Sequence, residues 1–310
     1  MNREIPGAQL RAWTLAAAAG PILSIIGRNG WMTVLIVAVA AGALSFCVLS
    51  CKRIKPPRWL CVVELVWLAV FLGKIGKISG TCWNGDALLA IPVIMIFLGA
   101  FASRRGGVPA ARTGATLVWV VIPVLAIVAI AGVADVNTSW IRMEVEIPDS
   151  LLIGLLLVPC LCTFLPAEPN TGMRWSAALL GVIAVIAALL VDGTVGGDVA
   201  ARAENSFYEL SKSINLFGVA ERFEALIACM LTGSWFALFT LILSAGYHLL
   251  EDLLPVAGKY GIWLVATVGV IFMYLLPNDR GWIAVGTLIF WGFLPVVTQG
   301  VVSAKNMQKK

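Results

Sequence analysis

Long apolar runs separated by short polar segments dominate the chain. Ten such runs cover residues 8–26, 31–50, 58–79, 87–103, 113–133, 149–165, 174–193, 217–245, 259–276 and 281–301. A helix of about 20 apolar residues crosses a bilayer core about 30 Å thick, and these runs are of that order. The pattern therefore predicts an all-α integral membrane protein with ten transmembrane helices in a single membrane domain, residues 1–310.

Composition supports a membrane protein and excludes several other classes. Of the 310 residues, 60% are hydrophobic and 13% are charged, whereas about a quarter of the residues of a soluble domain are charged. The mean hydropathy is +0.94. The net charge of +5 does not indicate nucleic-acid binding, because the cationic residues follow the alternation of the connecting segments. The seven cysteines and the single histidine, His248, lack metal-ligand spacing. We expect no metal, no cofactor and no enzymatic activity.

The cationic residues of the connecting segments predict an orientation. Lys and Arg are enriched in cytoplasmic loops of membrane proteins. With a cytoplasmic N-terminus, the cytoplasmic segments contain "CKRIKPPR", "SRRGG" and "KNMQKK", and most of the acidic residues fall on the opposite side. We therefore predict that both termini are cytoplasmic, in a plasma membrane.

Two connecting segments show helical amphipathicity. On the outer side, residues 196–215 mix charges with Phe207, Tyr208 and Leu210, which predicts an amphipathic helix over the bundle. On the inner side, residues 246–255 set four leucines opposite Glu251 and Asp252, which predicts a second one. Ordinary interfacial packing explains both patterns equally well.

The first apolar run is interrupted by Gly20 and Pro21, the two weakest helix formers. Three explanations compete: a cleaved signal peptide, a proline kink, or a functional break in the helix. Pro21 cannot donate a hydrogen bond to the carbonyl of Ala17, so a backbone acceptor is freed at mid-membrane depth. A kink satisfies this acceptor with a neighbouring side chain, and a binding site satisfies it with a ligand.

The sixth run, residues 149–165, is also short and is interrupted by Pro159. Residues 8–133 and 149–301 then form two sets of five spans. Because each set has an odd number of spans, the second set begins on the opposite side of the membrane and is inverted relative to the first. Paired interruptions at corresponding positions of inverted halves are the sequence pattern of a transporter-type site between discontinuous helices. We predict a 5+5 inverted repeat in which helices one and six are discontinuous.

Two patches resemble the spore-germination permeases, the B-subunit family of nutrient germinant receptors within the amino acid–polyamine–organocation superfamily. "EIPGAQLRAWTLAAAAGPILSI" is similar to the family's first span, in which a Gln-Leu pair begins the helix and a Gly marks the unwound segment; Gln9, Leu10 and Gly20 match these places. The second patch is "FYELSKSINLFGVAERFEALIACMLTGSWF". It resembles the outer-loop helix followed by a Glu-Arg-Phe/Ile-Glu/Asp motif.

The resemblance implies a LeuT-like fold in which the first and sixth helices meet the third and eighth around a midplane cavity. Bare N–H and C=O groups at the two breaks suit a zwitterion such as an amino acid. The predicted ligand-binding residues are Ala18, Ala19, Gly20, Pro21, Trp67, Phe71, Pro159, Cys160 and Thr232. Trp67 and Phe71 are equally explained as core or lipid-facing packing residues. The hydroxyls of Thr232 and Ser234 are candidate sodium ligands, or they bond to the carbonyls of their own helix.

Charged residues supply two further candidate sites. Glu64 lies inside an apolar run, which indicates a proton relay or a buried ion pair, although extension toward the inner interface is an alternative. The motif residues Glu221, Arg222 and Glu224 lie at the outer interface. They form either an outer gate or a plain solvated surface.

The function implied is that of a spore germinant-receptor subunit that senses a small amino acid or similar nutrient. Its partners would be membrane lipid, a larger A-type membrane subunit and a lipoprotein C-type subunit, in a bacterial plasma membrane or spore inner membrane. A proton-coupled amino acid permease is the second hypothesis. A structural subunit without a ligand is the third.

Overall fold

A computed structural model describes residues 4–50, 57–81, 89–104, 106–166, 172–203, 205–213, 220–254, 258–277 and 281–298, and the elements in these ranges are all helical. The α-helices are α1 (Gly7–Ile25), α2 (Trp31–Ser50), α3 (Arg58–Thr81), α4 (Ala90–Ser103), α5 (Gly107–Ala134), α6 (Ser150–Leu156), α7 (Met173–Val191), α8 (Gly197–Arg202), α9 (Ser206–Ser213), α10 (Ala220–Leu253), α11 (Gly258–Leu275) and α12 (Gly281–Thr287). Three short 3-10 helices are η1 (Ile26–Arg28), η3 (Thr138–Trp140) and η4 (Val158–Phe164). Two π-helical segments are η5 (Asp192–Gly196) and η6 (Leu288–Phe293).

The predicted apolar spans are found as helices, with differences in length. Among the described residues, seven helical segments are long and apolar enough to cross a membrane: Gly7–Arg28, Trp31–Ser50, Arg58–Gly80, Gly107–Ala134, Met173–Arg202, Glu224–Leu253 and Gly281–Thr298. Two shorter apolar helices are Ala90–Ser103 and Tyr260–Leu275. The predicted span 149–165 is divided between α6 and η4. The chain is therefore an all-helical protein with the lengths and hydropathy of an integral membrane protein.

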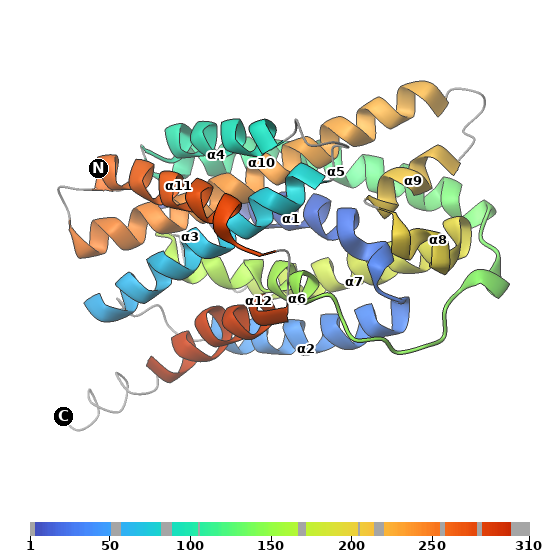
Figure 1. The fold of residues 1–310 in the computed structure, drawn as a ribbon, viewed down its shortest axis with the longest axis horizontal. Helices are drawn as coiled ribbons and strands as arrows, with labels where there is room; N and C mark the ends of the chain where they lie inside the picture. Colours follow the sequence, from blue (N-terminus) through green and yellow to red (C-terminus); the bar gives the residue numbers. More distant parts are fainter. Residues whose placement is uncertain are drawn as a thin grey trace.

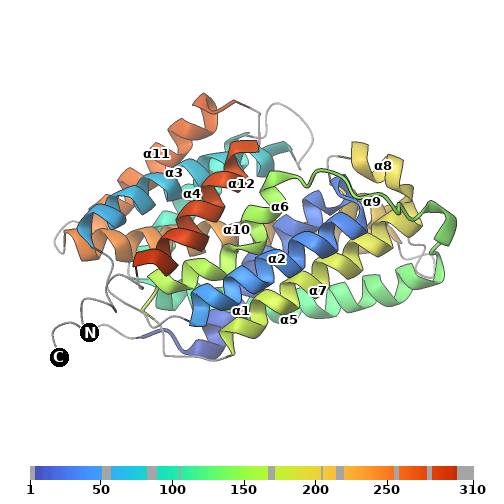
Figure 2. The same cartoon turned by 90° about the horizontal axis from the view of Figure 1, so that it is seen from below.

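Helix α1 runs through the middle of the bundle (Figure 1). It packs mainly against α5 and α10, and next against α7. Its buried positions include small residues on several faces, such as Gly7, Ala16, Ala17, Ala18 and Ala19, so neighbouring helices approach it from all sides. Helices α2 and α7 lie side by side along the bundle (Figure 2).

The bundle has two different ends. Helices α8 and α9 gather at one of them, on the right in Figure 1, and α5 ends there, since Asn137 donates its backbone N–H to the carbonyl of Gly193. We call this the α9 end. At the opposite end α4 stops and α5 begins, with Gly106 at φ 89° in the turn between them. We call this the Arg104 end.

Both predicted amphipathic helices are different in the structure. In place of one helix over residues 196–215, two short helices, α8 and α9, follow the π-helical segment η5. The break between them falls at Ala203, which has an extended backbone. Residues 246–253 form no separate helix but continue α10 to Leu253. Gly246 interrupts nothing there, because a single glycine within strong helix formers costs only about 1 kcal/mol.

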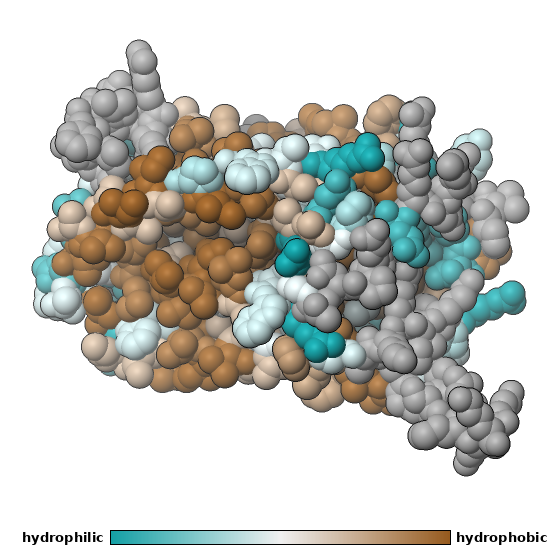
Figure 3. Space-filling model, turned by 180° about the vertical axis from the view of Figure 1, so that it is seen from behind, coloured by the Kyte–Doolittle hydropathy of each residue, from teal (hydrophilic) through white to brown (hydrophobic). Residues whose placement is uncertain are grey.

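The outer surface is largely apolar. Figure 3 shows a broad hydrophobic face, with hydrophilic residues gathered mainly toward one end. Large apolar side chains on several helices are exposed, among them Trp119 at 82%, Ile130 at 77% and Trp175 at 73%. Exposed apolar belts of this extent are typical of surfaces covered by lipid.

Two lysines near the end of α3 do not extend outward, as their position in an apolar run would allow. Lys74 is buried and donates to the carbonyl of Pro277, and Lys77 donates to the carbonyl of Leu276 at 2.9 Å. Both carbonyls directly follow the last residue of α11, Leu275, where basic side chains can bind the carbonyls at a helix C-terminus. The two cations thus cap α11 and tie it to α3.

Candidate functional site

Gly20 is a point of close approach between α1 and α10. A Cβ atom at Gly20 would lie 2.3 Å from Cβ of Ser234 and 3.4 Å from the carbonyl oxygen of Leu231. Ser234 is fully buried, and its Oγ has no hydrogen-bond partner among the residues that the structure describes. A buried hydroxyl without a partner costs about 1–3 kcal/mol, so this group requires an explanation.

The predicted break in α1 is wrong. Ala18, Ala19, Gly20 and Pro21 are buried as predicted for a central site, but they lie inside one continuous α-helix. The ring of a proline crowds the backbone N–H and the Cβ of the preceding residue, and Gly20 has no Cβ to add to this crowding. The helix continues through Pro21 without a hydrogen bond from residue 21 to the carbonyl of Ala17.

The interruption predicted in the sixth run is present, two residues before Pro159. Helix α6 ends at Leu156, and from Val158 the chain continues as the 3-10 helix η4. Pro159 and Cys160 are both buried in η4. The Sγ of Cys160 lies 3.4 Å from Oγ of Ser45 on α2.

Helix η4 also contacts α1 directly. Oγ1 of Thr14 lies 3.2 Å from Sγ of Cys162, and the same hydroxyl donates to the carbonyl of Leu10 at 2.8 Å. The non-α segment of the sixth run is thus placed between α1 and α2. Sequence reasoning missed Thr14 and Cys162, because polar atoms this small give no distinct pattern in an apolar run.

Trp67 and Phe71 share one face of α3, as predicted, and line an aromatic cluster. The ring of Trp67 stacks on Phe290 with centroids 5.0 Å apart, and Phe71 meets Trp291 edge-on at 4.6 Å. A Cβ at Gly154 of α6 would lie 3.0 Å from the Phe71 ring. These residues join α3 to α6 and η6.

Glu64 lies fully buried on α3, and within the described part of the chain neither carboxylate oxygen has a hydrogen-bond partner. It therefore does not extend to an interface. Thr232, in contrast, donates to the carbonyl of Ala228 at 2.7 Å and is only partly buried. Of the two predicted hydroxyls, only that of Ser234 has its donor unused among the described residues, and only Ser234 is fully buried.

One of the three predicted gate residues can be placed. Glu224 accepts a hydrogen bond of 3.3 Å from the Tyr208 hydroxyl, which joins α9 to the beginning of α10. The side chains of Glu221 and Arg222 lie outside the described residues. On α9 itself, Glu209 accepts a hydrogen bond from Lys212, which raises the pKa of that lysine above its usual value.

A stronger polar cluster at the α9 end was not predicted. The guanidinium of Arg142 donates to Asp192 at 2.9 Å and to the carbonyl of Gly27 at 3.1 Å, and it reaches Glu146 at 3.4 Å. Asp192 is fully buried. This Arg142 cluster joins the end of α1, the end of α7 and the connection between α5 and α6. Its sequence signal is Arg142 itself, the only cation between residues 113 and 173.

The beginning of α6 is tied to the same end. Asp149 caps α6 by accepting from the backbone N–H of Leu151 at 3.0 Å. Its own backbone N–H donates to Asn29 at 2.7 Å, and its carboxylate lies 3.8 Å from Arg28. The two central segments, α1 and α6, are therefore held together where they reach the α9 end.

Comparisons with known proteins identify the fold. No family model matches the chain, and no curated protein matches its sequence. Among solved structures, the chain is similar to Mhp1, a nucleobase-cation-symport-1 family transporter in a closed conformation with bromovinylhydantoin bound. The TM-score is 0.54 at 15% identity, and the match covers 93% of this chain and 75% of that one. The chain has a transporter-type membrane fold.

Proposed function

We propose that the chain binds a small amino acid or a similar molecule between α1, α10 and η4, near the middle of the membrane. The unpartnered hydroxyl of Ser234, buried against Gly20, is the observation that carries this proposal. The fold supports it, since the similar transporter Mhp1 holds a small organic molecule.

The polar groups near this contact favour the positive part of a ligand. Because α1 is continuous, its N–H groups bond within the helix and cannot hold a carboxylate as the discontinuous form would. The carbonyl of Ala17 and the oxygen of Ser234 are acceptors. We therefore infer that an ammonium group or a coupling cation such as sodium lies at Ser234.

The packing of the helices supports an inverted repeat of five and five spans. α1 packs on α5 as α6 packs on α12, and α1 packs on α7 as α6 packs on α2. α3 packs on α11 as α10 packs on α4. When each span of the first half is replaced by the corresponding span of the second half, and the reverse, the first contact of each comparison becomes the second. A repeat of five and five spans has this symmetry.

Ser234→Ala tests the site, with Thr232→Ala as the matched control on the same helix. Loss of one hydrogen bond to a charged group corresponds to roughly tenfold in affinity. The ligands to screen are the twenty amino acids, each with and without sodium. We expect Ser234→Ala to raise about tenfold the concentration of ligand or sodium that gives half of the maximal thermal stabilisation. Thr232→Ala should behave as the wild type, because that side chain is only partly buried and its hydroxyl donates within α10. Equal behaviour of the two variants contradicts the proposal.

The finer assignment that we favour is a nutrient germinant-receptor subunit with cytoplasmic termini, because the Gln9-Leu10 and Glu221–Glu224 patches resemble that family. It predicts copurification with an A-type membrane subunit and a lipoprotein subunit encoded nearby. Absence of both from flanking reading frames counts against it.

A proton-coupled permease is the second candidate, favoured by the buried, unpartnered carboxylate of Glu64. Uptake of a labelled amino acid into proteoliposomes that is lost in Glu64→Gln supports the permease. Binding without uptake supports a sensor, and neither binding nor uptake supports a structural subunit.

A further inference from the structure

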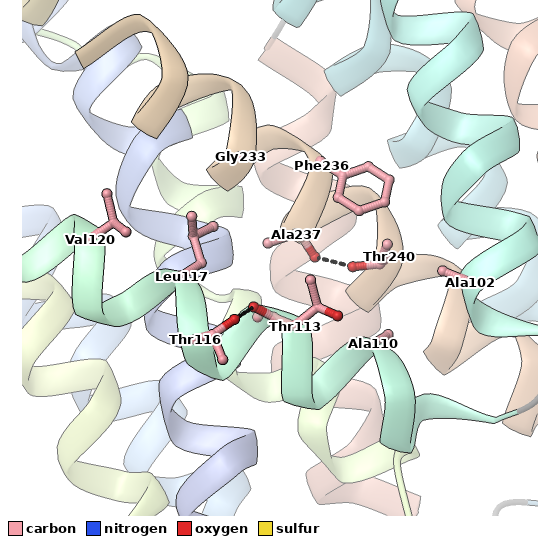
Figure 4. Close-up of a pocket in the computed structure, with 11 residues that line it drawn as sticks. Ala102, Ala110, Thr113, Thr116, Leu117, Val120, Gly233, Phe236, Ala237 and Thr240 are labelled. Carbon is pink, nitrogen blue, oxygen red and sulfur yellow. Dashed lines mark hydrogen bonds between the residues drawn. The ribbon is translucent and has the colours of Figure 1, made fainter. Parts of the chain in front are cut away.

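A crevice of about 350 Å³ opens between α5 and α10, with α4 at one side (Figure 4). None of the predicted ligand-binding residues lines it. Its lining residues come from three helices: Ala102, Ala110, Thr113, Gly114, Thr116, Leu117, Val120, Gly233, Phe236, Ala237 and Thr240. Both α4 and α5 pack on α10, but they contact each other much less, and this divergence leaves the space.

The crevice is held open by the helices behind it. Gly114 gives room to the ring of Trp13, since a Cβ there would lie 2.0 Å from Cδ1 of that ring. The indole N–H of Trp13 donates to the carbonyl of Ala237 at 3.2 Å. One buried side chain of α1 therefore fixes α5 and α10 relative to each other, and the crevice is preformed.

The three hydroxyls in the crevice are already engaged within their own helices. Thr113 donates to the carbonyl of Pro109 and Thr116 to the carbonyl of Thr113, at 3.2 and 2.8 Å. Thr240 donates to the carbonyl of Ala237 at 2.9 Å. With these donors used, the walls offer mainly carbon atoms, which suit an alkyl chain better than a polar ligand.

The crevice has the depth of one membrane leaflet. Its lining on α5 runs from Ala110 to Val120, a rise of about 15 Å along a helix, which is half of a hydrocarbon core about 30 Å thick. Val120 is 42% exposed and its neighbour Trp119 is 82% exposed. This part of α5 thus lies on the apolar surface and not in the interior.

Cations lie at one end of the crevice, the Arg104 end. Arg104 follows the lining residue Ala102 by two positions, and Arg112 directly precedes Thr113. The guanidinium of Arg104 lies 3.9 Å from the centre of the exposed Phe101 ring, which holds its charge at the surface. Cationic residues at this depth attract anionic lipid headgroups.

We propose that the crevice binds one acyl chain of an anionic phospholipid, whose headgroup phosphate contacts Arg104 and Arg112. The positive-inside rule places this lipid in the cytoplasmic leaflet. The site differs from the proposed ligand site in position and in chemistry.

Native mass spectrometry of the purified full chain, titrated with phosphatidylglycerol or phosphatidylcholine of the same acyl chains, tests the proposal. We expect the wild type to prefer phosphatidylglycerol, by about fivefold for each arginine that contacts the phosphate. The double variant Arg104→Gln/Arg112→Gln should lose the preference. Thr116→Trp, which fills the crevice, should weaken binding of both lipids.

Matched variants control for general effects of charge and bulk. Arg58→Gln removes an exposed arginine at the beginning of α3, and Ile130→Trp adds an indole on α5 outside the crevice; both should bind lipid as the wild type does. Equal binding of the two lipids by the wild type overturns the proposal without any variant. Unchanged phosphatidylglycerol binding in Thr116→Trp, or displacement of the phospholipid by a free fatty acid, also overturns it.

Discussion

Helix α1 and the α6–η4 segment both contain a proline within an apolar run, but only the second segment changes its helical form. The residues before the two prolines differ in shape, although α5 continues as an α-helix through Ile122 and Pro123, so this difference is only one contribution. Gly20 has no Cβ to clash with the ring of Pro21, and α1 continues as an α-helix. Val158 is β-branched, and the chain before Pro159 has already changed to a 3-10 helix.

The surroundings of the two prolines differ as well. α1 presses on α10 at Gly20, and Ser24 donates its hydroxyl to the Gly20 carbonyl at 2.9 Å. At the end of α6, the N–H of Leu157 is shared between the carbonyls of Ile153 and Gly154, both at 3.2 Å. Such shared bonds are common where an α-helix tightens into a 3-10 turn. A proline in a membrane helix therefore does not by itself mark a break, and the surrounding hydrogen bonds and packing contribute to the outcome.

The largest effect on this comparison is expected from Arg142→Met, which releases the end of α1 from α7. Asp192 would remain fully buried without its cation. Removing one partner of a buried pair costs about 3–5 kcal/mol. We expect a destabilisation of about 3 kcal/mol, at the lower end because Arg142 keeps 15% of its side-chain surface exposed. Thermal unfolding in detergent measures it.

Glu146→Gln is the control for Arg142→Met. Glu146 contacts the same guanidinium at 3.4 Å, but its side chain is 39% exposed, and exposed pairs contribute about 1 kcal/mol or less. If both variants unfold alike, the buried pair with Asp192 does not hold α1.

The second prediction concerns the contact between α1 and α10. A methyl group at Gly20 would collide with Ser234 at 2.3 Å, whereas a Cβ at Gly42 of α2 would meet nothing within 4 Å. Overpacking a core costs about 1–3 kcal/mol, so Gly20→Ala should destabilise by about 2 kcal/mol. Gly42→Ala should be neutral or slightly stabilising. The difference between their melting temperatures is the measurement, and equal temperatures would show that Gly20 does not act through close packing.

The smallest effect is expected from Val158→Ala, which removes the branched side chain before Pro159. Loss of the two methyl groups of a buried valine costs roughly 1–2 kcal/mol, and relief of the crowding before Pro159 partly offsets it. We therefore expect a net change of about 1 kcal/mol or less, with α6 extended toward Pro159. Hydrogen exchange of the amides of residues 157–161 reports the extension. An unchanged exchange pattern would mean that η4 is set by its contacts with α1 and α2.

Apolar run length predicted most of the fold, because every span must satisfy its backbone within itself in hydrocarbon. The runs at 31–50 and 58–79 correspond closely to α2 and α3. The amphipathic pattern at residues 246–255 was misread as a separate helix. It is equally the pattern of an α-helix that leaves the membrane, and periodicity alone does not separate the two.

The candidate site was predicted only in part, for a different reason. Buried positions such as Gly20, Ser234 and Glu64 follow from their place in apolar runs. The sequence does not show which hydroxyl keeps an unused donor, because the bond from Thr232 to the carbonyl of Ala228 depends on the rotation of the side chain. The Arg142 cluster joins residues 115 and 50 positions apart, and no local pattern records such a contact.

The length of α10 constrains how the molecule sits in the membrane. Its 34 residues measure about 51 Å, and even a tilt of about 40° leaves only about 39 Å of helix within a core about 30 Å thick. More than two turns therefore lie beyond the hydrocarbon, at Glu224 on one side and at the contact between His248 and Glu251 on the other. α10 is one continuous helix that reaches the headgroup layers of both leaflets. A displacement of either end therefore also moves Ser234.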